Sequence, residues 1–397
     1  MLNMYHLTII HKAVYLWYNV LSIIMNFIYD RVLTRENICN LKTEQKLIEK
    51  HISSKHNVVL YAPRNFGKTS LVKAITIPDF KNKHKDSFVF FADLMGVKSM
   101  DSLVQRLKKA LNASLKESFP LKNIIENISE YIKNLRPNIS IDIEGGEPKV
   151  KVSTYNSKPE LTISDIFKII DNISKKHNCL IVLDEFQDIS FVNEAEALFR
   201  DVFQNWDIPV IILGSKKHIL THIFAKPNAP LASFGHDVVI KNIDYEEFHK
   251  YMNERFELKK NRINLENSKI LQNLMLRVPE SINILGFELN YIFQETNITK
   301  NEIDIAINSI LNNRQERFEF LMKIISKAEE TILKTIAKQG GVVIHPTSKT
   351  FLAMANLTAR TVSLNVDKLL DNGFLEVEDE HFRISDGLLC KYIQKFR

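Results

Sequence analysis

The sequence is poor in cysteine and glycine. Cysteine occurs at Cys39, Cys179 and Cys390 only, and these positions form neither a C-x-x-C pair nor the spacing of a metal site. Their separation argues against a disulfide framework or a zinc site built on them, and it fits a reducing compartment. Glycine contributes only 11 of the 397 residues, so a turn built around glycine is notable wherever it occurs.

No charge of one sign dominates. Lysine and arginine exceed aspartate and glutamate by six, so charge alone identifies no partner. Charged residues make up 25% and hydrophobic residues 45%, as in soluble globular proteins, which disfavours wholesale disorder, a collagen-like repeat or a polytopic membrane protein. At about 150 residues per domain, the length predicts two or three domains.

The first thirty residues are the least typical part of the chain. Residues 13–29 run for 17 positions without a charge, the lower limit for crossing a hydrocarbon core. Three interpretations stand: a membrane or surface helix, an upstream extension without function, and an ordinary packed helix. Few positive charges precede the run and no small-x-small cleavage site follows it, which argues against a signal peptide. We expect a hydrophobic extension over residues 1–30 and a cytoplasmic protein, with membrane association through residues 13–29 as the alternative.

Five short apolar runs are each followed by a helical pattern. They cover residues 57–61, 87–92, 179–183, 209–213 and 237–240. This alternation is typical of a parallel sheet with helices on both faces. We therefore predict an α/β domain over residues 31–244.

The first run leads into a loop that matches G-x-x-x-x-G-K-[ST] except at its first glycine. The loop residues are Ala62, Pro63, Arg64, Asn65, Phe66, Gly67, Lys68, Thr69 and Ser70. In this context backbone N–H groups and a helix N-terminus bind phosphate, Lys68 reaches the β and γ phosphates, and the Thr69 hydroxyl binds Mg²⁺. Alanine tolerates positive φ poorly, so Ala62 predicts a tighter loop or a lower nucleotide affinity.

The third run ends in two consecutive carboxylates. We predict that Asp184 lies on the Mg²⁺ side and that Glu185 is the general base for the attacking water. The alternative is that both residues only cap the following helix. The phosphate loop and this acidic pair occur in order, each at a strand end, which favours a nucleotide site.

The fourth run ends at Gly214 and Ser215, where a small polar side chain can sense a γ-phosphate. A plain strand-end turn has the same pattern, so both interpretations stay open for Ser215. An extra strand between the phosphate loop and the acidic strand indicates the ATPase branch in which a glutamate activates water.

Three further segments complete the predicted organisation. Residues 137–159 contain two alternating runs around Gly145 and Gly146, which predict a β-hairpin inserted in the sheet domain, either as a surface excursion or as a partner-binding arm. Residues 245–325 are helical in pattern and predict a lid. Residues 326–397 have the order helix, helix, helix, hairpin, which is typical of a winged helix.

These motifs resemble those of the prokaryotic and archaeal P-loop ATPase family related to STAND and AAA+ proteins. The resemblance rests on YAPRNFGKTSL, IVLDEFQDI, VIILGS and the closing FRISDGLLCKYI, and it covers the chain from about Phe27 onward. It implies ATP and Mg²⁺ as ligands. Lys68, Thr69, Asp184 and Glu185 match the family pattern, as does Ser215.

The sequence departs from the family pattern at several positions besides Ala62. The segment that ends in a phosphate-sensing arginine is lengthened here and ends in His236, which is not a safe substitute. The G-x-P signature of the lid, which lies near adenine in STAND proteins, is reduced to Arg277, Val278 and Pro279, of which only Pro279 matches. Pro279 is therefore a candidate nucleotide contact.

The closing module raises the possibility of DNA binding. Its third helix, residues 358–372, would present Arg360, Asn365 and Lys368 to the major groove. Residues 326–397 are nearly neutral, however, and the wing carries four acidic residues at positions 376–380, which disfavour contact with phosphates. A structural or protein-docking winged helix is the alternative.

We predict a regulatory ATPase of the STAND or AAA+ type that hydrolyses ATP slowly. Its nucleotide state would be coupled to the lid and the winged helix, and an unidentified protein partner would control it. The alternative is an ATP-dependent DNA-binding protein of the replication-initiator or transposition-helper type. A nucleotide-binding scaffold with negligible turnover is a third possibility. The oligomeric state is not predicted.

Overall fold

The computed structural model describes residues 26–119, 131, 139–144, 147–152, 159–204, 206–215, 220, 223–224, 227–378 and 380–397. The chain divides into two compact units. The sheet unit comprises Lys42–Ala62 and Leu71–Ile240, and the helical unit comprises Met1–Leu41, Pro63–Ser70 and Lys241–Arg397.

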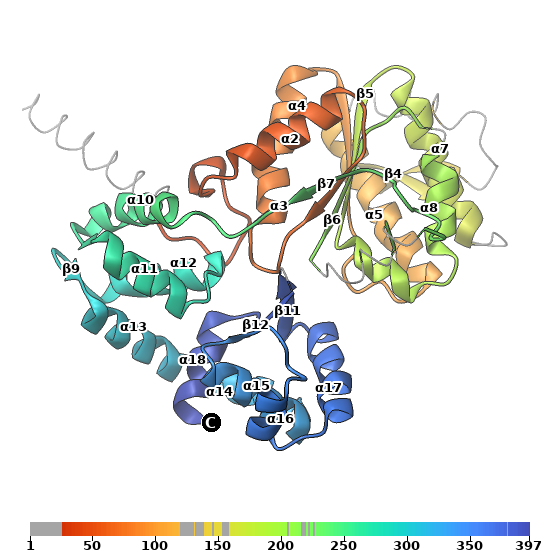
Figure 1. Cartoon of the computed structure of the whole chain (residues 1–397). Coiled ribbons are helices and arrows are strands. Elements are labelled where there is room, and N and C mark those ends of the chain that lie inside the picture. Colours follow the sequence, from red (N-terminus) through yellow and green to blue (C-terminus); the bar gives the residue numbers. More distant parts are fainter. Residues whose placement is uncertain are drawn as a thin grey trace, which may run out of the picture. The chain divides into compact units, whose positions relative to one another are not determined.

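Five parallel strands form the central sheet of the sheet unit, in the spatial order β2, β5, β6, β1, β7 (Figure 1). Their bounds are Val58–Tyr61 for β1, Ser87–Asp93 for β2, Asn178–Asp184 for β5, Val210–Gly214 for β6 and His236–Val239 for β7. Each predicted run forms a strand, which confirms the parallel α/β prediction. The extra strand is confirmed too, because β6 lies between β1 and β5.

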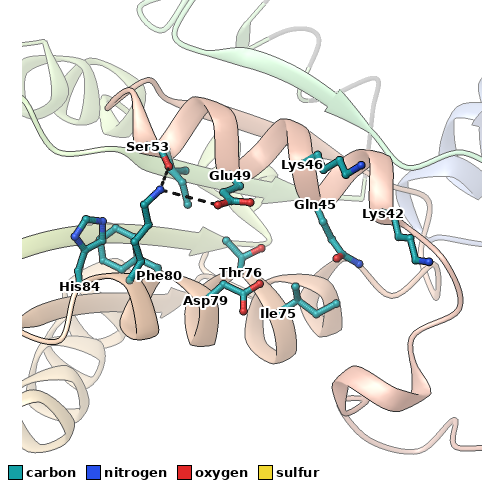
Figure 2. Close-up of a pocket in the computed structure, with 12 residues that line it drawn as sticks. Lys42, Gln45, Lys46, Glu49, Ser53, Ile75, Thr76, Asp79, Phe80 and His84 are labelled. Atoms are coloured by element: carbon teal, nitrogen blue, oxygen red, sulfur yellow. Dashed lines mark hydrogen bonds and ion pairs between the residues drawn. The ribbon is translucent and has the colours of Figure 1, made fainter.

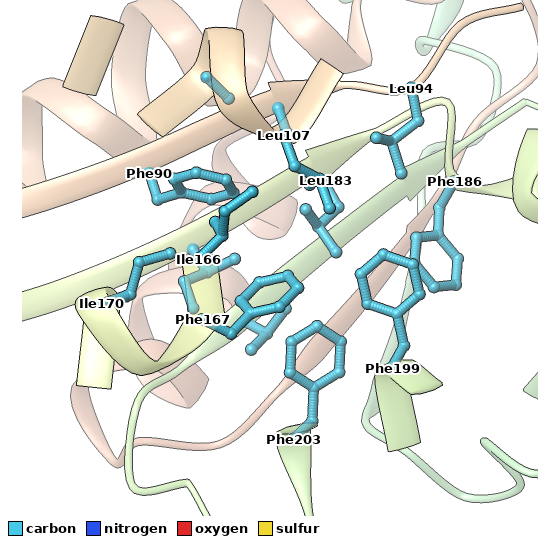
Figure 3. Packing of buried hydrophobic residues seen from close by; sticks show 14 of the residues in the cluster. Phe90, Leu94, Leu107, Ile166, Phe167, Ile170, Leu183, Phe186, Phe199 and Phe203 are labelled. Carbon is cyan, nitrogen blue, oxygen red and sulfur yellow. The ribbon is translucent and has the colours of Figure 1, made fainter. Parts of the chain in front are cut away.

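Both faces of this sheet are covered, so its central strands read as continuous apolar runs. The four residues of β1 are all buried, as are the five of β6. On one face, Phe90 and Leu183 join a large cluster with the helices α5 (Met100–Ser118), α7 (Pro159–Ser174) and α8 (Ala195–Phe203). Figure 3 shows the ring of Phe167, from α7, beside those of Phe199 and Phe203, from α8. Burial of this kind is the main stabilising term for the sheet.

The opposite face is covered by α2 (Lys42–Ser53) and by the helix that follows the phosphate loop. That helix starts as α3 (Lys68–Leu71), passes through a π-helical turn, η2 (Val72–Thr76), and continues as α4 (Ile77–Lys83). Pro78 has no N–H to donate, and the N–H of Ile77 bonds to the Val72 carbonyl five residues back.

The predicted hairpin is also present. Strands β3 (Ile139–Glu144) and β4 (Glu147–Val152) pair antiparallel with each other, from Ile139 opposite Val152 to Glu144 opposite Glu147. Gly145 and Gly146, which the sequence places at the turn, lie outside the described residues.

In the helical unit, the predicted lid segment forms five α-helices. They are α10 (Tyr245–Phe256), α11 (Leu265–Leu274), α12 (Pro279–Ile292), α13 (Lys300–Asn313) and α14 (Gln315–Lys323). The sequence predicts helix throughout, whereas two short parallel strands, β8 (Arg262–Ile263) and β9 (Asn297–Ile298), join α10 to α11 and α12 to α13. These two strands pair with each other as a two-stranded sheet, and asparagine side chains accept hydrogen bonds from backbone groups in and beside them. Asn253 Oδ1 accepts the N–H of Ile263, and Asn261 Oδ1 accepts that of Thr296.

The last part of the helical unit has the predicted winged-helix order. Its elements are α15 (Lys327–Lys338), β10 (Val342–Val343), α16 (Lys349–Ala355), α17 (Ala359–Asp371), β11 (Leu375–Glu378), β12 (His381–Ile384) and α18 (Gly387–Phe396). The wing strands β11 and β12 pair antiparallel, and β10 adds a third, two-residue strand that the sequence pattern does not indicate.

Residues 1–25, and with them most of the hydrophobic run at 13–29, lie outside the described residues. Within the described part, no helix combines the length and apolar character needed to cross a membrane. The end of the run packs in the helical unit. Phe27 is 2% exposed, and its ring contacts Tyr251 and Phe256 and lies against Gly286.

Phe27→Ala tests this packing. Removing the buried ring should lower the free energy of unfolding of the helical unit by about 3 kcal/mol, since the cavity cannot fully collapse. Urea unfolding followed by circular dichroism measures the change. Val32→Ala, at a position that is 46% exposed, is the control and should change stability by less than about 0.5 kcal/mol. Equal effects of the two substitutions would contradict the packing.

Candidate functional site

The carboxyl ends of three neighbouring strands meet at one edge of the sheet. The strands β1, β6 and β5 are parallel and adjacent, so their carboxyl-terminal residues lie at that edge. These are Ala62 after β1, Gly214 and Ser215 at the end of β6, and Asp184 and Glu185 at the end of β5. The N–H of Ala62 donates to the Gly214 carbonyl at 3.3 Å. Ligands of open α/β sheets bind outside this edge, so the phosphate loop begins where ligand binding is expected.

Glu185 has a strained backbone conformation, and two hydrogen bonds fix the orientation of its carboxylate. Its backbone is left-handed, with φ 52° and ψ 42°, a conformation that costs a non-glycine residue about 1 kcal/mol or more. Its carboxylate accepts hydrogen bonds from Gln187 Nε2 at 2.5 Å and from Ser215 Oγ at 3.1 Å. Glu185 makes no side-chain cap to the 3₁₀ helix η3 (Phe186–Phe191), which contradicts the capping interpretation for this residue.

Gln187 is a positioning residue that the residue pattern alone does not identify. It is 1% exposed, and its amide oxygen packs so closely on Gly214 that a Cβ there would lie 2.7 Å from it. The absence of a side chain at Gly214 therefore makes room for Gln187, and Gln187 in turn donates to Glu185. The available signal was the DEFQ string itself, within the IVLDEFQDI motif that carries part of the family resemblance.

Asp184 ends the buried strand β5 and is 5% exposed. Its Oδ1 accepts the N–H of Glu185 at 3.0 Å, so the two carboxylates are linked through one backbone group. Nearby, Asp188 accepts the N–H of Gly96 at 2.7 Å and ties the loop after β2 to the loop after β5. The acidic residues are thus fixed by backbone donors before any ligand arrives.

In the phosphate loop, which belongs to the helical unit, two residues have a left-handed backbone conformation: Asn65, with φ 65°, and Gly67, with φ 80°. Ala62 is not among the residues with positive φ, so alanine meets no such backbone demand at the start of the loop, and a lower nucleotide affinity stays a prediction. Asn65 carries this conformation because short polar side chains tolerate it. Lys68 is 7% exposed, and Ser70 Oγ accepts the N–H of Leu33 at 3.1 Å.

The wing of the winged helix holds the phosphate loop within this unit. The N–H of Arg64 donates to the Glu376 carboxylate at 2.6 Å. Arg383 contacts the Glu376 carboxylate at 3.2 Å, contacts that of Glu378 at 3.4 Å and stands over the Phe66 ring at 5.0 Å. A side chain at Gly373 would collide with the Arg64 guanidinium. The first half of the loop is therefore clamped by β11 and β12.

Glu376 and Arg383 form a buried ion pair, with side chains 10% and 5% exposed. Burial raises the pKa of the Glu376 carboxyl, and Arg383 and the Arg64 N–H partly oppose that rise. A buried charge needs such partners, because losing one leaves the other uncompensated. The Arg64 N–H is consequently engaged with an anion supplied by the chain itself.

This arrangement fits an anionic ligand. A loop N–H that already binds a carboxylate oxygen is suited to a phosphate oxygen. A Cβ at Gly67 would meet nothing within 4 Å, so open space adjoins that residue. The hydroxyl of Thr69 and the carboxylate of Asp184 are hard oxygen donors of the type that Mg²⁺ prefers. The predicted ATP and Mg²⁺ are therefore compatible with the residues present.

The two predicted sets of site residues belong to different units. The loop residues Pro63–Ser70 lie in the helical unit, whereas Asp184, Glu185 and Ser215 lie in the sheet unit. Each set is ordered within its own unit by the contacts given above. The assignments of Lys68, Thr69 and Ser215 to nucleotide or metal stay predictions.

The other positions considered from the sequence have different surroundings. Pro279 is the first residue of α12, and its contact with nucleotide stays a prediction. The Arg277 guanidinium stacks on the Tyr245 ring at 4.0 Å and bonds to the Ile243 carbonyl. His236 begins β7 opposite Val58, at the edge of the sheet remote from Ala62, so it cannot stand in for a phosphate-sensing arginine.

A separate pocket of about 280 Å³ lies between α2 and the helix formed by η2 and α4 (Figure 2). Lys83 Nζ reaches across it to Ser53 Oγ at 2.9 Å and to the Glu49 carboxylate at 4.0 Å. Its walls come from the helices rather than from the strand ends, so it is distinct from the site described above.

Comparison with known proteins shows which class of fold the chain has. Residues 316–395 match the family model described as "Probable winged helix domain". A Walker-type ATPase of Pyrococcus abyssi is similar over 93% of this chain and 99% of its own, with a TM-score of 0.62 and 16% identity. The fold is thus that of P-loop ATPases with a C-terminal winged helix, as the family resemblance implies.

The chain is also similar in fold to the ORC2 protein of Aeropyrum pernix, solved in ADPNP and ADP complexes. It matches 93% of this chain and 97% of its own, with a TM-score of 0.53 and 12% identity. Comparison of the sequence with curated proteins finds no match.

The strain at Glu185 can be measured by comparing two substitutions. Both Glu185→Ala and Glu185→Gly remove the carboxylate, but only glycine adopts φ 52° without cost. The relief of about 1–2 kcal/mol of backbone strain should exceed the about 0.4–1 kcal/mol that the unfolded-state freedom of glycine costs, so the glycine variant should be the more stable by up to about 1 kcal/mol. Thermal and urea unfolding of the two variants give the difference, and a glycine variant no more stable than the alanine variant would contradict the strain.

Proposed function

We propose that this chain binds ATP with Mg²⁺ and hydrolyses it slowly, as a regulatory switch of the STAND or AAA+ type. The nucleotide state would be coupled to the lid and the winged helix, and a protein partner would control turnover. The observation that carries the proposal is the hydrogen bond from the Arg64 N–H to Glu376, because it joins the phosphate loop to the wing.

The phosphate loop supplies the binding part of this function. Its backbone N–H groups and the ammonium of Lys68 are donors for the phosphate oxygens of a nucleotide. The left-handed residues Asn65 and Gly67 support this role, because they turn the backbone as a phosphate cradle requires. ATP is preferred over GTP because no N-K-x-D motif for guanine follows the fourth strand.

The residues at the sheet edge supply the hydrolytic part. Glu185 would take the proton of the attacking water, and Gln187 and Ser215 hold its carboxylate in one orientation. Thr69 and Asp184 would hold Mg²⁺. A bound Mg²⁺ supplies charge neutralisation at the phosphate oxygens. A base oriented by two donors is pre-organised, which favours turnover over a purely structural role.

The wing would make the site a switch. A hydrogen bond to a charged group contributes about 1.5–3 kcal/mol, so Glu376 competes appreciably with phosphate for the Arg64 N–H. Binding of nucleotide would therefore favour release of the wing, and release of the wing would favour binding, by the same factor in both directions. A partner that pulls on the winged helix would change nucleotide affinity through this contact.

The first test separates binding from turnover. Lys68→Ala should lose Mg²⁺-dependent ATP binding, because the buried ammonium is the main cation of the loop. Glu185→Gln should bind ATP as the wild type does but release phosphate at least about 100-fold more slowly. Isothermal titration and a phosphate-release assay measure these effects. Equal phosphate release by wild type and Glu185→Gln would instead favour the nucleotide-binding scaffold.

The second test addresses the switch. Glu376→Gln removes the charge and keeps the shape, so the Arg64 N–H should be held less strongly and ATP affinity should rise about tenfold. Glu380→Gln, in the exposed wing turn, removes the same charge as the matched control and should change affinity less than about twofold. Titration of both variants, with melting curves in the absence of nucleotide, gives the result. Equal shifts would indicate general charge repulsion and would refute the coupling.

The second candidate is an ATP-dependent DNA-binding protein of the initiator or transposition-helper type. Arg360 and Lys368 on α17 are exposed, which supports it, whereas Glu376 and Glu378 of the wing are engaged with Arg383. Salt-dependent binding of the full chain to duplex DNA separates the two functions.

A further inference from the structure

Three histidines, two of them close together in the sequence and the third distant, meet at the edge of the sheet remote from Ala62. They are His51 in the last turn of α2, His56 just before β1 and His236 at the start of β7. Both α2 and β7 contact β1. The three offer ring-nitrogen ligand atoms that all lie within 4.8 Å of one another. His51 is half-buried, and His56 and His236 are exposed.

The turn at the end of α2 brings the first two histidines together. The N–H of His56 donates to the His51 carbonyl at 2.9 Å, and that of Lys55 donates to the Ile52 carbonyl at 3.0 Å. Lys55 has φ 59°, so this is the glycine-type helix end in which the chain reverses over its last turn. The reversal places the His51 and His56 rings 6.2 Å apart between their centroids.

Strand pairing brings in the third histidine. His236 lies opposite Val58 in the parallel β1–β7 register, and its N–H donates to the Asn57 carbonyl at 2.9 Å. Gly235 lies so close to the Asn57 backbone that a Cβ would come within 2.9 Å of it. The His236 ring stacks on His51 at 4.0 Å between centroids and lies 5.3 Å from His56. The backbone at the third ligand is therefore fixed.

We propose that His51, His56 and His236 bind a divalent transition-metal ion, with Zn²⁺ as the physiological candidate. Three imidazole nitrogens suit zinc, and they leave a fourth position for water or another ligand. Tetrahedral zinc with bonds of about 2.1 Å needs its ligand atoms about 3.4 Å apart, which modest side-chain rotations from the present arrangement achieve.

The ion would clamp α2 to β1 and β7. β7 is far from α2 and β1 in the sequence, so an ion that binds the folded arrangement stabilises it by mass action. The charged residues next to the three histidines in the sequence are Lys50, Lys55 and Asp237. Lys55 is paired with Asp207. This site is independent of the proposed ATPase function, since no predicted nucleotide residue belongs to it.

The test uses the metal-free full-length chain. Zn²⁺ titrated by calorimetry should bind with one equivalent at this site, and Co²⁺ should give the visible absorption of a tetrahedral complex. His236→Ala should weaken binding by at least about 100-fold, because even outer-shell partners of a metal contribute about 10- to 100-fold. His56→Ala provides a second variant, at an exposed position whose substitution leaves the core intact.

His345→Ala, which removes an exposed histidine of the helical unit, is the matched control and should leave the affinity unchanged. Lys68→Ala should also retain the metal, which distinguishes this site from any Mg²⁺ held with nucleotide. Circular dichroism verifies that each variant is folded. The proposal is overturned if the wild type shows no saturable Zn²⁺ binding, or if His236→Ala and His56→Ala bind as tightly as His345→Ala.

Discussion

Parallel pairing of β1, β6 and β5 is the constraint on which the site residues of the sheet unit depend. Parallel strands must all end at the same edge, so the start of the phosphate loop, the Gly214–Ser215 turn and the acidic pair meet there without any contact made for that purpose. The strands are buried on both faces, which makes this edge a rigid platform. The left-handed backbone of Glu185 persists on it because Gln187 and Ser215 both bond to the carboxylate.

Within the helical unit, the corresponding interaction is electrostatic. The Glu376 carboxylate bonds to a loop N–H and pairs with Arg383, and Arg383 stands over the loop residue Phe66. Wing and loop are therefore joined by groups that are mostly buried and mutually dependent. The acidic residues of the wing disfavour binding to DNA phosphates. One of them, Glu376, instead accepts a hydrogen bond from the Arg64 N–H of the phosphate loop.

The two edges of the sheet thus offer different ligand chemistry. One edge carries carboxylate and hydroxyl oxygens, which suit a hard cation. The other carries three imidazoles, which suit a borderline transition metal. The same parallel register explains both, since β1 leads from the histidine edge, beside His236, to the phosphate loop.

Much of this molecule follows from local sequence signals. The five strands, the winged-helix order and the identity of the loop and acidic motifs could be predicted, because apolar runs, turn residues and the G-K-T spacing act over a few neighbouring residues. The missing first glycine of the motif draws attention to Ala62, whereas Asn65 and Gly67 are the loop residues that take the left-handed conformations. Which residue takes the left-handed conformation depends on the backbone path of the whole loop.

Only the tertiary structure decided the contacts between distant segments. Arg64 and Glu376 are 312 positions apart, Ser215 and Glu185 are 30 apart, and His236 joins His51 and His56 from the far end of the sheet unit. No periodicity in the sequence records these pairs. They arise because strand order and helix packing bring separate elements together, and the resulting side-chain environments exist only once those elements are buried against one another.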